Sequence, residues 1–263
     1  MTVEVRYYTD PACPRSWGAE PELRRLMWEF AGGLRFTWVM GGLAREYSAA
    51  EHPALVAEWL DLTAETGMPT DPRLWLRNPI ASSHPACQAV KAATEQGSEA
   101  GYAYLRRVRE GLMVERRKLD HAEALVGEAG PAGLDVDRFR IDLDSNATVE
   151  AFAADLEEVR DGGIELPSAS FVSADGSRHG VSGGDPYDTY REAALAAGAA
   201  PPTTDRLPGT LEVVERFGRA ATKEVEALTE RPRPIVEAEL WSLAREWRLR
   251  PVAVLTGTLW ERA

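Results

Sequence analysis

The sequence contains few cysteines and few histidines. Its 263 residues include two cysteines, Cys13 and Cys87, and four histidines. Two cysteines so far apart exclude the disulfide framework of small secreted domains. Neither cysteine has a cysteine or histidine neighbour at the spacing of a zinc motif, and the histidines are equally scattered. We therefore expect two free thiols, no metal site and no bound cofactor.

The chain also lacks an excess of positive charge and any long apolar run. It has 30 Lys and Arg residues against 42 Asp and Glu residues, a formal net charge of -12. Because phosphate binding requires concentrated basic residues, this balance argues against a nucleic-acid partner. No stretch approaches the roughly 20 apolar residues of a membrane span, and residues 1–7 do not resemble a signal peptide. We expect a cytoplasmic protein that binds no membrane.

The sequence does have a cysteine placed between a strand and a helix. Residues 3–8 alternate as in a strand, and Asp10-Pro11 follows as a turn. Residues 20–30 carry apolar side chains at helical spacing. Cys13 is therefore expected at the start of a helix, where unpaired N–H groups and the helix dipole stabilise a thiolate. Ser16 stands where a dithiol oxidoreductase has its second cysteine, so this predicted nucleophile has no neighbouring thiol.

The pattern that follows predicts an α/β domain interrupted by helices. Residues 34–40 read as a second strand, and the order strand, helix, strand implies a parallel pair with Cys13 at the carboxyl end of the first strand. A helical insertion is expected at about residues 52–144, with helices over 53–66, 85–95, 99–114, 121–129 and 136–143. The next elements expected are a helix over 146–161 with Ser145 or Asn146 as its N-cap, strands over 164–172 and 177–181, and a helix over 186–197.

The last part of the sequence reads as a separate small module. Residues 199–208 are rich in Ala, Pro and Thr and are expected to form a linker. Beyond it, helices over 220–228 and 235–247 and a hairpin over 249–260 suggest a winged-helix-like tail at residues 209–263. Its second helix carries Glu237, Glu239 and Glu246. This acidic face favours dimerisation, or docking on the main domain, over DNA binding.

Three segments together resemble the DsbA-like thioredoxin-fold family. Asp10-Pro11-x-Cys13-Pro14-x-x-Trp17 resembles the active-site entry of that family, which includes the FrnE-type oxidoreductases, and the run through Gly18-Ala19-Glu20-Pro21 is most similar to the YjbH/SpxH adaptor branch. Residues 166–171 resemble the loop that carries a cis-proline facing the cysteine, and residues 78–93 look like part of the helical insertion. The resemblance covers residues 3–198. It implies a thioredoxin-like α/β fold with an α-helical insertion in domain 1–198.

The resemblance also implies roles for the residues around the cysteine. The predicted catalytic residues are Cys13 as the nucleophile, Ser16 as a hydrogen-bond donor to the thiolate, and Pro167 as the proline that shapes the groove. The predicted substrate-binding residues are Pro14, Arg15, Trp17 and Ser168. Arg15 is as well explained by a solvated side chain as by a cation that lowers the pKa of Cys13. A core packing role for Cys87 is favoured over that of a resolving thiol.

Three functions fit these residues. The first is a thiol oxidoreductase in which Cys13 forms a mixed disulfide with a protein or with a low-molecular-weight thiol as co-substrate, and an external thiol resolves it. The second is a non-catalytic adaptor of YjbH/SpxH type that binds a client protein and presents it for proteolysis. The third and weaker one is a thiol-cofactor-dependent isomerase or transferase. In the first two, a protein or peptide occupies the groove beside Pro167, and a homodimer through the C-terminal module is a further candidate.

Overall fold

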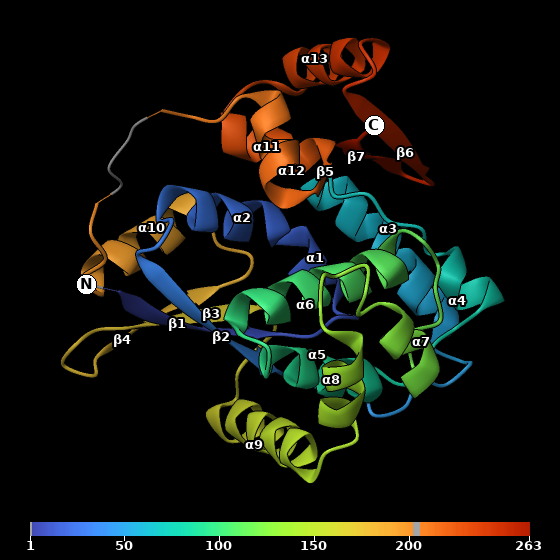
Figure 1. Cartoon of the computed structure of the whole chain (residues 1–263), viewed down its shortest axis with the longest axis vertical. Coiled ribbons are helices and arrows are strands. Elements are labelled where there is room, and N and C mark those ends of the chain that lie inside the picture. Colours follow the sequence, from blue (N-terminus) through green and yellow to red (C-terminus); the bar gives the residue numbers. More distant parts are fainter. Residues whose placement is uncertain (1, 202–205) are drawn as a thin grey trace.

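The computed structural model describes residues 2–201 and 206–263, and its centre is a four-stranded sheet (Figure 1). The strands lie in the order β2-β1-β3-β4. The first pair, β1 and β2, is parallel with Val3 opposite Leu34, and the other two pairs are antiparallel. The bounds are β1 Val3–Thr9, β2 Leu34–Met40, β3 Ser168–Val172 and β4 Arg178–Ser182. The predicted parallel β-α-β start of the domain is confirmed.

Alternation along β1 directs its side chains to two helical layers. Val5 and Tyr7 are fully buried in the main core, on the face covered by α2 (Glu20–Glu29) and α10 (Tyr187–Ala196) (Figure 1). On the opposite face, Arg6 and Tyr8 both bind Glu158 of α9 (Asn146–Gly162), and the Tyr8 hydroxyl donates to that carboxylate at 2.8 Å. The sheet is therefore covered on both faces, as in an α/β fold.

The helical insertion contains the predicted helices and one more. They are α3 His52–Thr66, α4 Arg73–Arg77, α5 His84–Thr94, α6 Ser98–Met113, α7 Ala122–Gly127 and α8 Val136–Leu143. Sequence analysis missed α4 because five residues are too few to show a helical period. The predicted N-cap of α9 is Ser145, whose hydroxyl accepts a hydrogen bond from the Thr148 amide.

One predicted strand is shorter than expected. The strand predicted over residues 164–172 begins only at Ser168, after a cis Leu166–Pro167 peptide bond. Pro167 has no N–H to donate to a strand ladder. Its carbonyl instead accepts a hydrogen bond from Gly183 at 2.8 Å, which ties the start of β3 to the end of β4. The apolar Ile164 and Leu166 that suggested a strand belong to the preceding loop.

The C-terminal module has more elements than the sequence indicated. Its elements are α11 Thr210–Phe217, β5 Arg219–Ala221, α12 Thr222–Thr229, α13 Arg233–Arg245, β6 Leu249–Val254 and β7 Gly257–Arg262. The strands form a second sheet in the order β5-β7-β6, and β6 and β7 are the predicted hairpin. Sequence analysis missed α11 and β5. Part of the predicted linker, residues 202–205, lies outside the described residues.

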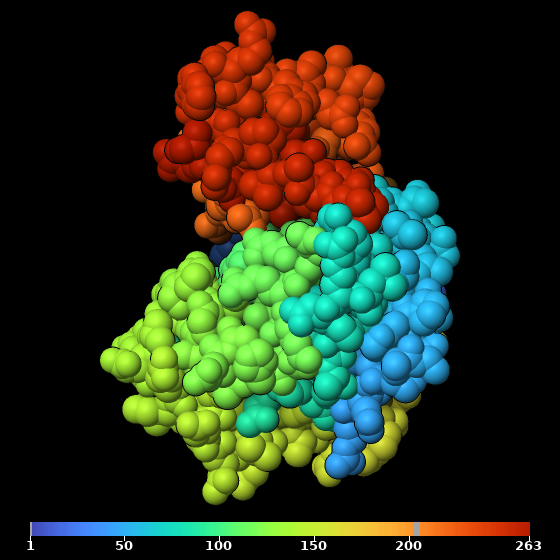
Figure 2. Space-filling model, turned by 90° about the vertical axis from the view of Figure 1, so that its right-hand side faces the viewer, coloured from blue at the N-terminus to red at the C-terminus, as the bar shows by residue number. Residues whose placement is uncertain are grey.

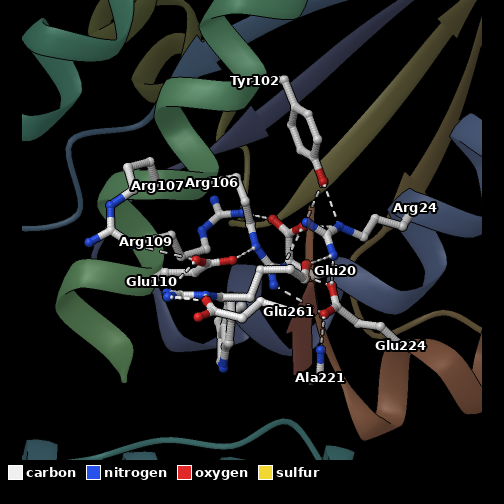
Figure 3. Close-up of polar contacts among 12 residues, drawn as sticks. Glu20, Arg24, Tyr102, Arg106, Arg107, Arg109, Glu110, Ala221, Glu224 and Glu261 are labelled. Atoms are coloured by element: carbon white, nitrogen blue, oxygen red, sulfur yellow. Dashed lines mark hydrogen bonds and ion pairs between the residues drawn. The ribbon is translucent and has the colours of Figure 1, made fainter. Parts of the chain in front are cut away.

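The C-terminal module docks on the main domain through a buried network of charges (Figure 3). At its centre is Arg106 of α6, which donates to Glu110 at 2.6 Å, to Glu20 of α2 at 3.2 Å and to both carboxylate oxygens of Glu224 of α12 at 2.8 and 3.0 Å. Glu20 and Glu224 are both fully buried. Arg24 of α2 also reaches into the module, where it donates to the Arg219 carbonyl at 2.7 Å.

This network makes the docking sensitive to the loss of any one member. Burial alone disfavours the ionised form of Glu20, but Arg109, Arg106 and Arg24 outweigh burial and lower the pKa of this carboxyl. A buried ion pair gains little over an apolar pair, whereas removal of one partner leaves an uncompensated buried charge. The network therefore fixes how the C-terminal module sits on α2 and α6.

We expect Arg106→Met to lower the free energy of unfolding by about 3–5 kcal/mol, because Glu20 and Glu224 are left with too few cations. Arg160→Met is the matched control, since Arg160 is 71% exposed and, among the residues that the structure describes, is paired with exposed Asp161. It should change stability by less than about 0.5 kcal/mol. Urea unfolding followed by circular dichroism measures both. Equal effects of the two substitutions would contradict the importance assigned to the network.

Acid should remove the stability that Glu115 contributes through its ion pairs with Arg107 and Arg219. Burial opposes the ionised form of Glu115, but Arg107 and Arg219 outweigh it and lower its pKa to about 2, from an ordinary value of 4.5. The resulting stability is complete above the higher pKa and is lost as the pH falls through the lower one. Glu115→Gln should therefore cost about 2 kcal/mol at pH 7 after solvent screening. The difference from wild type should shrink between pH 4.5 and pH 2, which urea unfolding across this range measures.

Candidate functional site

Cys13 caps the short helix α1 (Pro14–Gly18) directly after β1. Its backbone is extended, with φ -76° and ψ 114°, and its Sγ accepts a hydrogen bond from the Ser16 amide at 3.4 Å. Pro14 occupies the first helical turn, where its missing N–H removes no helical hydrogen bond. The local sequence thus places the sulfur at a helix N-terminus, as predicted. The Cys13 residue is only 3% exposed, however, and Ser16 is fully buried.

Asp10 connects the cysteine turn to the helical insertion. Its Oδ1 accepts the Ala12 amide at 2.7 Å, which forms the predicted turn. Its Oδ2 accepts three hydrogen bonds, from the Leu43 amide at 2.6 Å, the Ser83 hydroxyl at 2.8 Å and the Cys87 thiol at 3.1 Å. Asp10 is fully buried, so these donors compensate for its lost hydration. It fixes the turn against the loop after β2 and against α5.

Both cysteines are free and buried thiols in this structure. Cys87 lies in the main core and its thiol is used as a donor to Asp10. Burial and the Asp10 carboxylate raise the pKa of Cys87 well above its ordinary value. These contacts fit the favoured interpretation of Cys87 as a packing residue, and add a polar contact that sequence analysis did not foresee.

Burial also raises the pKa of Cys13. The Ser16 hydroxyl and amide oppose this shift, and the buried cation Arg109 opposes it further, whereas the Asp10 carboxylate adds to it. Burial has the largest effect, so the thiol form is favoured over the thiolate. The helix N-terminus that suggested a reactive thiolate does not outweigh the loss of solvent.

Arg109 of α6 contacts the residues that precede Cys13, and sequence analysis did not identify this arginine. Its Nη2 donates to the Thr9 hydroxyl at 2.7 Å and to the Asp10 carbonyl at 3.3 Å, and its Nη1 pairs with Glu20. The Asp10 carbonyl also accepts the Cys13 amide at 3.2 Å. No local pattern marks Arg109, because its partners lie about 90 or more residues away along the chain. Ser83 and Cys87, by contrast, fall within residues 78–93, the stretch whose resemblance to the insertion was noted.

Pro167 lies at the same end of the sheet as Cys13. In the β1–β3 register, Ser168 is opposite Tyr8, so Pro167 is level with the last residue of β1. The Leu166 side chain packs against Gly41 in the loop after β2. The contact is so close that a Cβ at Gly41 would collide with it. Pro167 is itself buried, while Ser168 is half-buried and its hydroxyl donates to the Glu165 carbonyl at 2.5 Å.

The predicted substrate-binding residues differ in their access to solvent. Trp17 is fully buried, its Nε1 donates to the Pro69 carbonyl at 2.8 Å, and its ring packs against the Arg106 guanidinium at 4.4 Å. The substrate-binding role of Trp17 stays a prediction, and in this structure its indole is turned toward the insertion and away from solvent. Pro14 is also buried, and Arg15 is exposed. The cation that acts on Cys13 is Arg109 rather than Arg15.

The described residues contain neither a membrane-spanning helix nor a cluster of metal ligands. Within residues 2–201 and 206–263, no helix is both long enough and apolar enough to cross a membrane. The same part of the chain has no group of three or more His, Cys, Asp or Glu side chains placed to hold a metal ion.

The strand order, the cysteine at the end of β1 and the cis-proline before β3 define a thioredoxin-like fold with a DsbA-type helical insertion. A sequence model of the family described as Thioredoxin matches residues 7–192. The chain belongs to this family. The match ends before the C-terminal module, so the winged-helix designation of that module stays a prediction.

Relatives in the SpxH group extend the similarity over both parts of the chain. The ClpXP adapter protein SpxH of Halalkalibacterium halodurans is 27% identical over 269 residues, which cover 98% of this chain and 88% of the relative. SpxH of Bacillus subtilis is 26% identical and covers 98% and 89%. Among solved structures, the cytosolic disulfide reductase DsbM from Pseudomonas aeruginosa matches with a TM-score of 0.62 at 22% identity over 73% of this chain and 98% of that one. That likeness supports the fold.

We expect both thiols to react slowly in the native protein. Iodoacetamide alkylation followed by mass spectrometry should show Cys13 with an apparent pKa at or above about 8.5, the value of an unperturbed cysteine. Cys87 should react only on unfolding, because its thiol is buried and donates to Asp10. The Cys13→Ser variant assigns the signals. A Cys13 pKa near 6 would contradict the dominance of burial over the helix N-terminus.

Proposed function

We propose that this protein is a non-catalytic thioredoxin-fold adaptor that binds a client protein and delivers it to a ClpXP-type protease. The observation that carries the proposal is the state of Cys13. A thiol-disulfide enzyme needs an accessible thiolate, whereas Cys13 is 3% exposed, has a raised pKa and has Ser16 where a resolving cysteine would stand. The fold keeps the architecture of a thiol site without these properties.

The two-part organisation supports the same proposal. An adaptor must contact both a client and a protease, which calls for more than one surface. The C-terminal module contacts the main domain through Arg106 and Glu224, both buried. Relatives described as ClpXP adapter proteins match 98% of the chain, including this module.

We assign client binding to a surface around the cysteine turn, defined by Arg15, Leu43, Leu166 and Ser168. Leu43 is 46% exposed although its amide is fixed by Asp10, and Ser168 and Leu166 flank the buried Pro167. An extended segment of a client can pair with backbone beside the proline and place an apolar side chain on Leu43. In this arrangement the buried Cys13 supports the binding surface by packing and does not react with the client.

The oxidoreductase remains the alternative, and the retained Asp10-Pro11-x-Cys13-Pro14 run is what favours it. Exchange with glutathione disulfide at pH 7.5 separates the two functions. Wild type and Cys13→Ser should show the same background rate if the protein is an adaptor. A rate in wild type that is at least about tenfold higher would support the enzyme and overturn the adaptor.

Client binding should depend on Leu43 and be independent of the Cys13 thiol. The experiment captures clients on the wild type, Cys13→Ser, Leu43→Asp and the matched control Leu76→Asp, whose leucine is 65% exposed on α4. A client identified by mass spectrometry is then purified and incubated with ClpXP. We expect faster degradation with wild type, Cys13→Ser and Leu76→Asp, and a loss of at least about tenfold in client affinity with Leu43→Asp, which places a charge on an apolar contact.

Two results would contradict the proposal. A client whose degradation by ClpXP is unchanged by the protein would remove the adaptor function. A client that is captured and degraded equally well with Leu43→Asp would leave the function in place and refute the binding surface.

A further inference from the structure

A pocket of about 920 Å³ lies between the main domain and the C-terminal module, on a different part of the molecule from Cys13. Its walls come from α2, β2 and α6 on one side and from the end of α11 and the start of β5 on the other. In the space-filling view, the C-terminal module sits on the main domain and a notch separates the two on the left (Figure 2). Pockets between packed units are frequent small-molecule sites, and this volume is within their usual range.

The inner wall of the pocket is aromatic. Trp38 is stacked between Phe36, at a ring-centroid distance of 5.2 Å, and Tyr102, at 5.3 Å. Phe36 and Tyr102 are only half-buried, and Phe30 and Phe217 also line the space. Such half-buried rings lose contact with water when an apolar body fills the pocket, which favours binding.

The charges around the pocket favour an anion. Its lining includes six arginines and three glutamates. Glu110 and Glu115 are both neutralised by Arg219, at 3.2 and 2.6 Å. At the exposed rim, Arg216 has no ion-pair partner in the described part of the chain, and Arg35 has Glu4 at 3.7 Å with 72% of its side chain exposed. The other four arginines are held in ion pairs. In a chain of net charge -12, the exposed Arg216 and the loosely paired Arg35 are the guanidinium groups placed to bind a carboxylate, sulfonate or phosphate.

We propose that this pocket binds a small organic anion with an apolar body, whose charged group contacts Arg216 and Arg35 and whose body packs on the Phe36, Trp38 and Tyr102 stack. The pocket exists only while the C-terminal module is docked, because Phe217 and Arg219 complete it. The ligand therefore stabilises the docked arrangement. This site is separate from the client surface.

The test is a fluorescence titration of the full-length protein with 8-anilinonaphthalene-1-sulfonate, an aromatic anion that brightens in apolar pockets. Ala103→Trp, on the half-buried wall residue Ala103 of α6, fills the pocket. We expect it to weaken binding by at least about tenfold. Ala57→Trp, on an exposed position of α3, is the matched control and should leave the affinity within about twofold. If Ala103→Trp does not fold by circular dichroism, Ala132→Trp, on another wall residue, replaces it.

The charge requirement is tested separately. Arg216→Glu should weaken binding by about tenfold, whereas Arg160→Glu, on a distant exposed arginine, should not. Trp247 is 86% exposed and Trp241 is 52% exposed, so they are the competing apolar site for the dye. Loss of binding in Trp247→Ala, unchanged binding in both filled variants, or no binding to wild type would each overturn the proposal.

Discussion

The arrangement of the whole molecule depends on the neutralisation of a few buried carboxylates by Arg106. This guanidinium contacts Glu20 of the first helical layer, Glu110 of its own helix and Glu224 of the C-terminal module, and it also covers the Trp17 ring. Without it, these buried acids would each lose a cation partner. Three parts of the chain that fold from separate segments are thereby required to meet at one point.

The same constraint holds the cysteine turn in a buried position. Glu20 begins α2, three residues after Trp17, and its partner Arg109 also donates to the Asp10 carbonyl. Buried charges therefore hold the backbone of the turn on one side. On the other side, Asp10 accepts hydrogen bonds from Leu43 and Ser83. A site so closely held keeps its shape, which suits recognition of a partner, and gives its sulfur little access to solvent.

Features with local causes could be predicted from the sequence, and those with distant causes could not. The strand at residues 3–8, the cysteine at a helix start and the helices of the insertion follow from periodicity and turn residues, and the family followed from the Asp10-to-Trp17 run together with Pro167. The length of α11 does not explain why it was missed, since α8 and α12 also have eight residues and were predicted. The contact between Arg106 and Glu224 spans 118 positions, so no local rule could reveal it.

Glu224 has a second contact whose consequence concerns how the protein folds. Besides Arg106, its carboxylate accepts the Ala221 amide at 2.6 Å and so caps the start of α12. One side chain therefore completes a helix inside the C-terminal module and joins that module to the main domain. In residues 206–263 on their own, Glu224 would still cap α12 but would have lost Arg106. In the main domain alone, Arg106 would have lost the Glu224 carboxylate. We therefore expect the two parts to unfold together, although only one of them carries the thioredoxin fold.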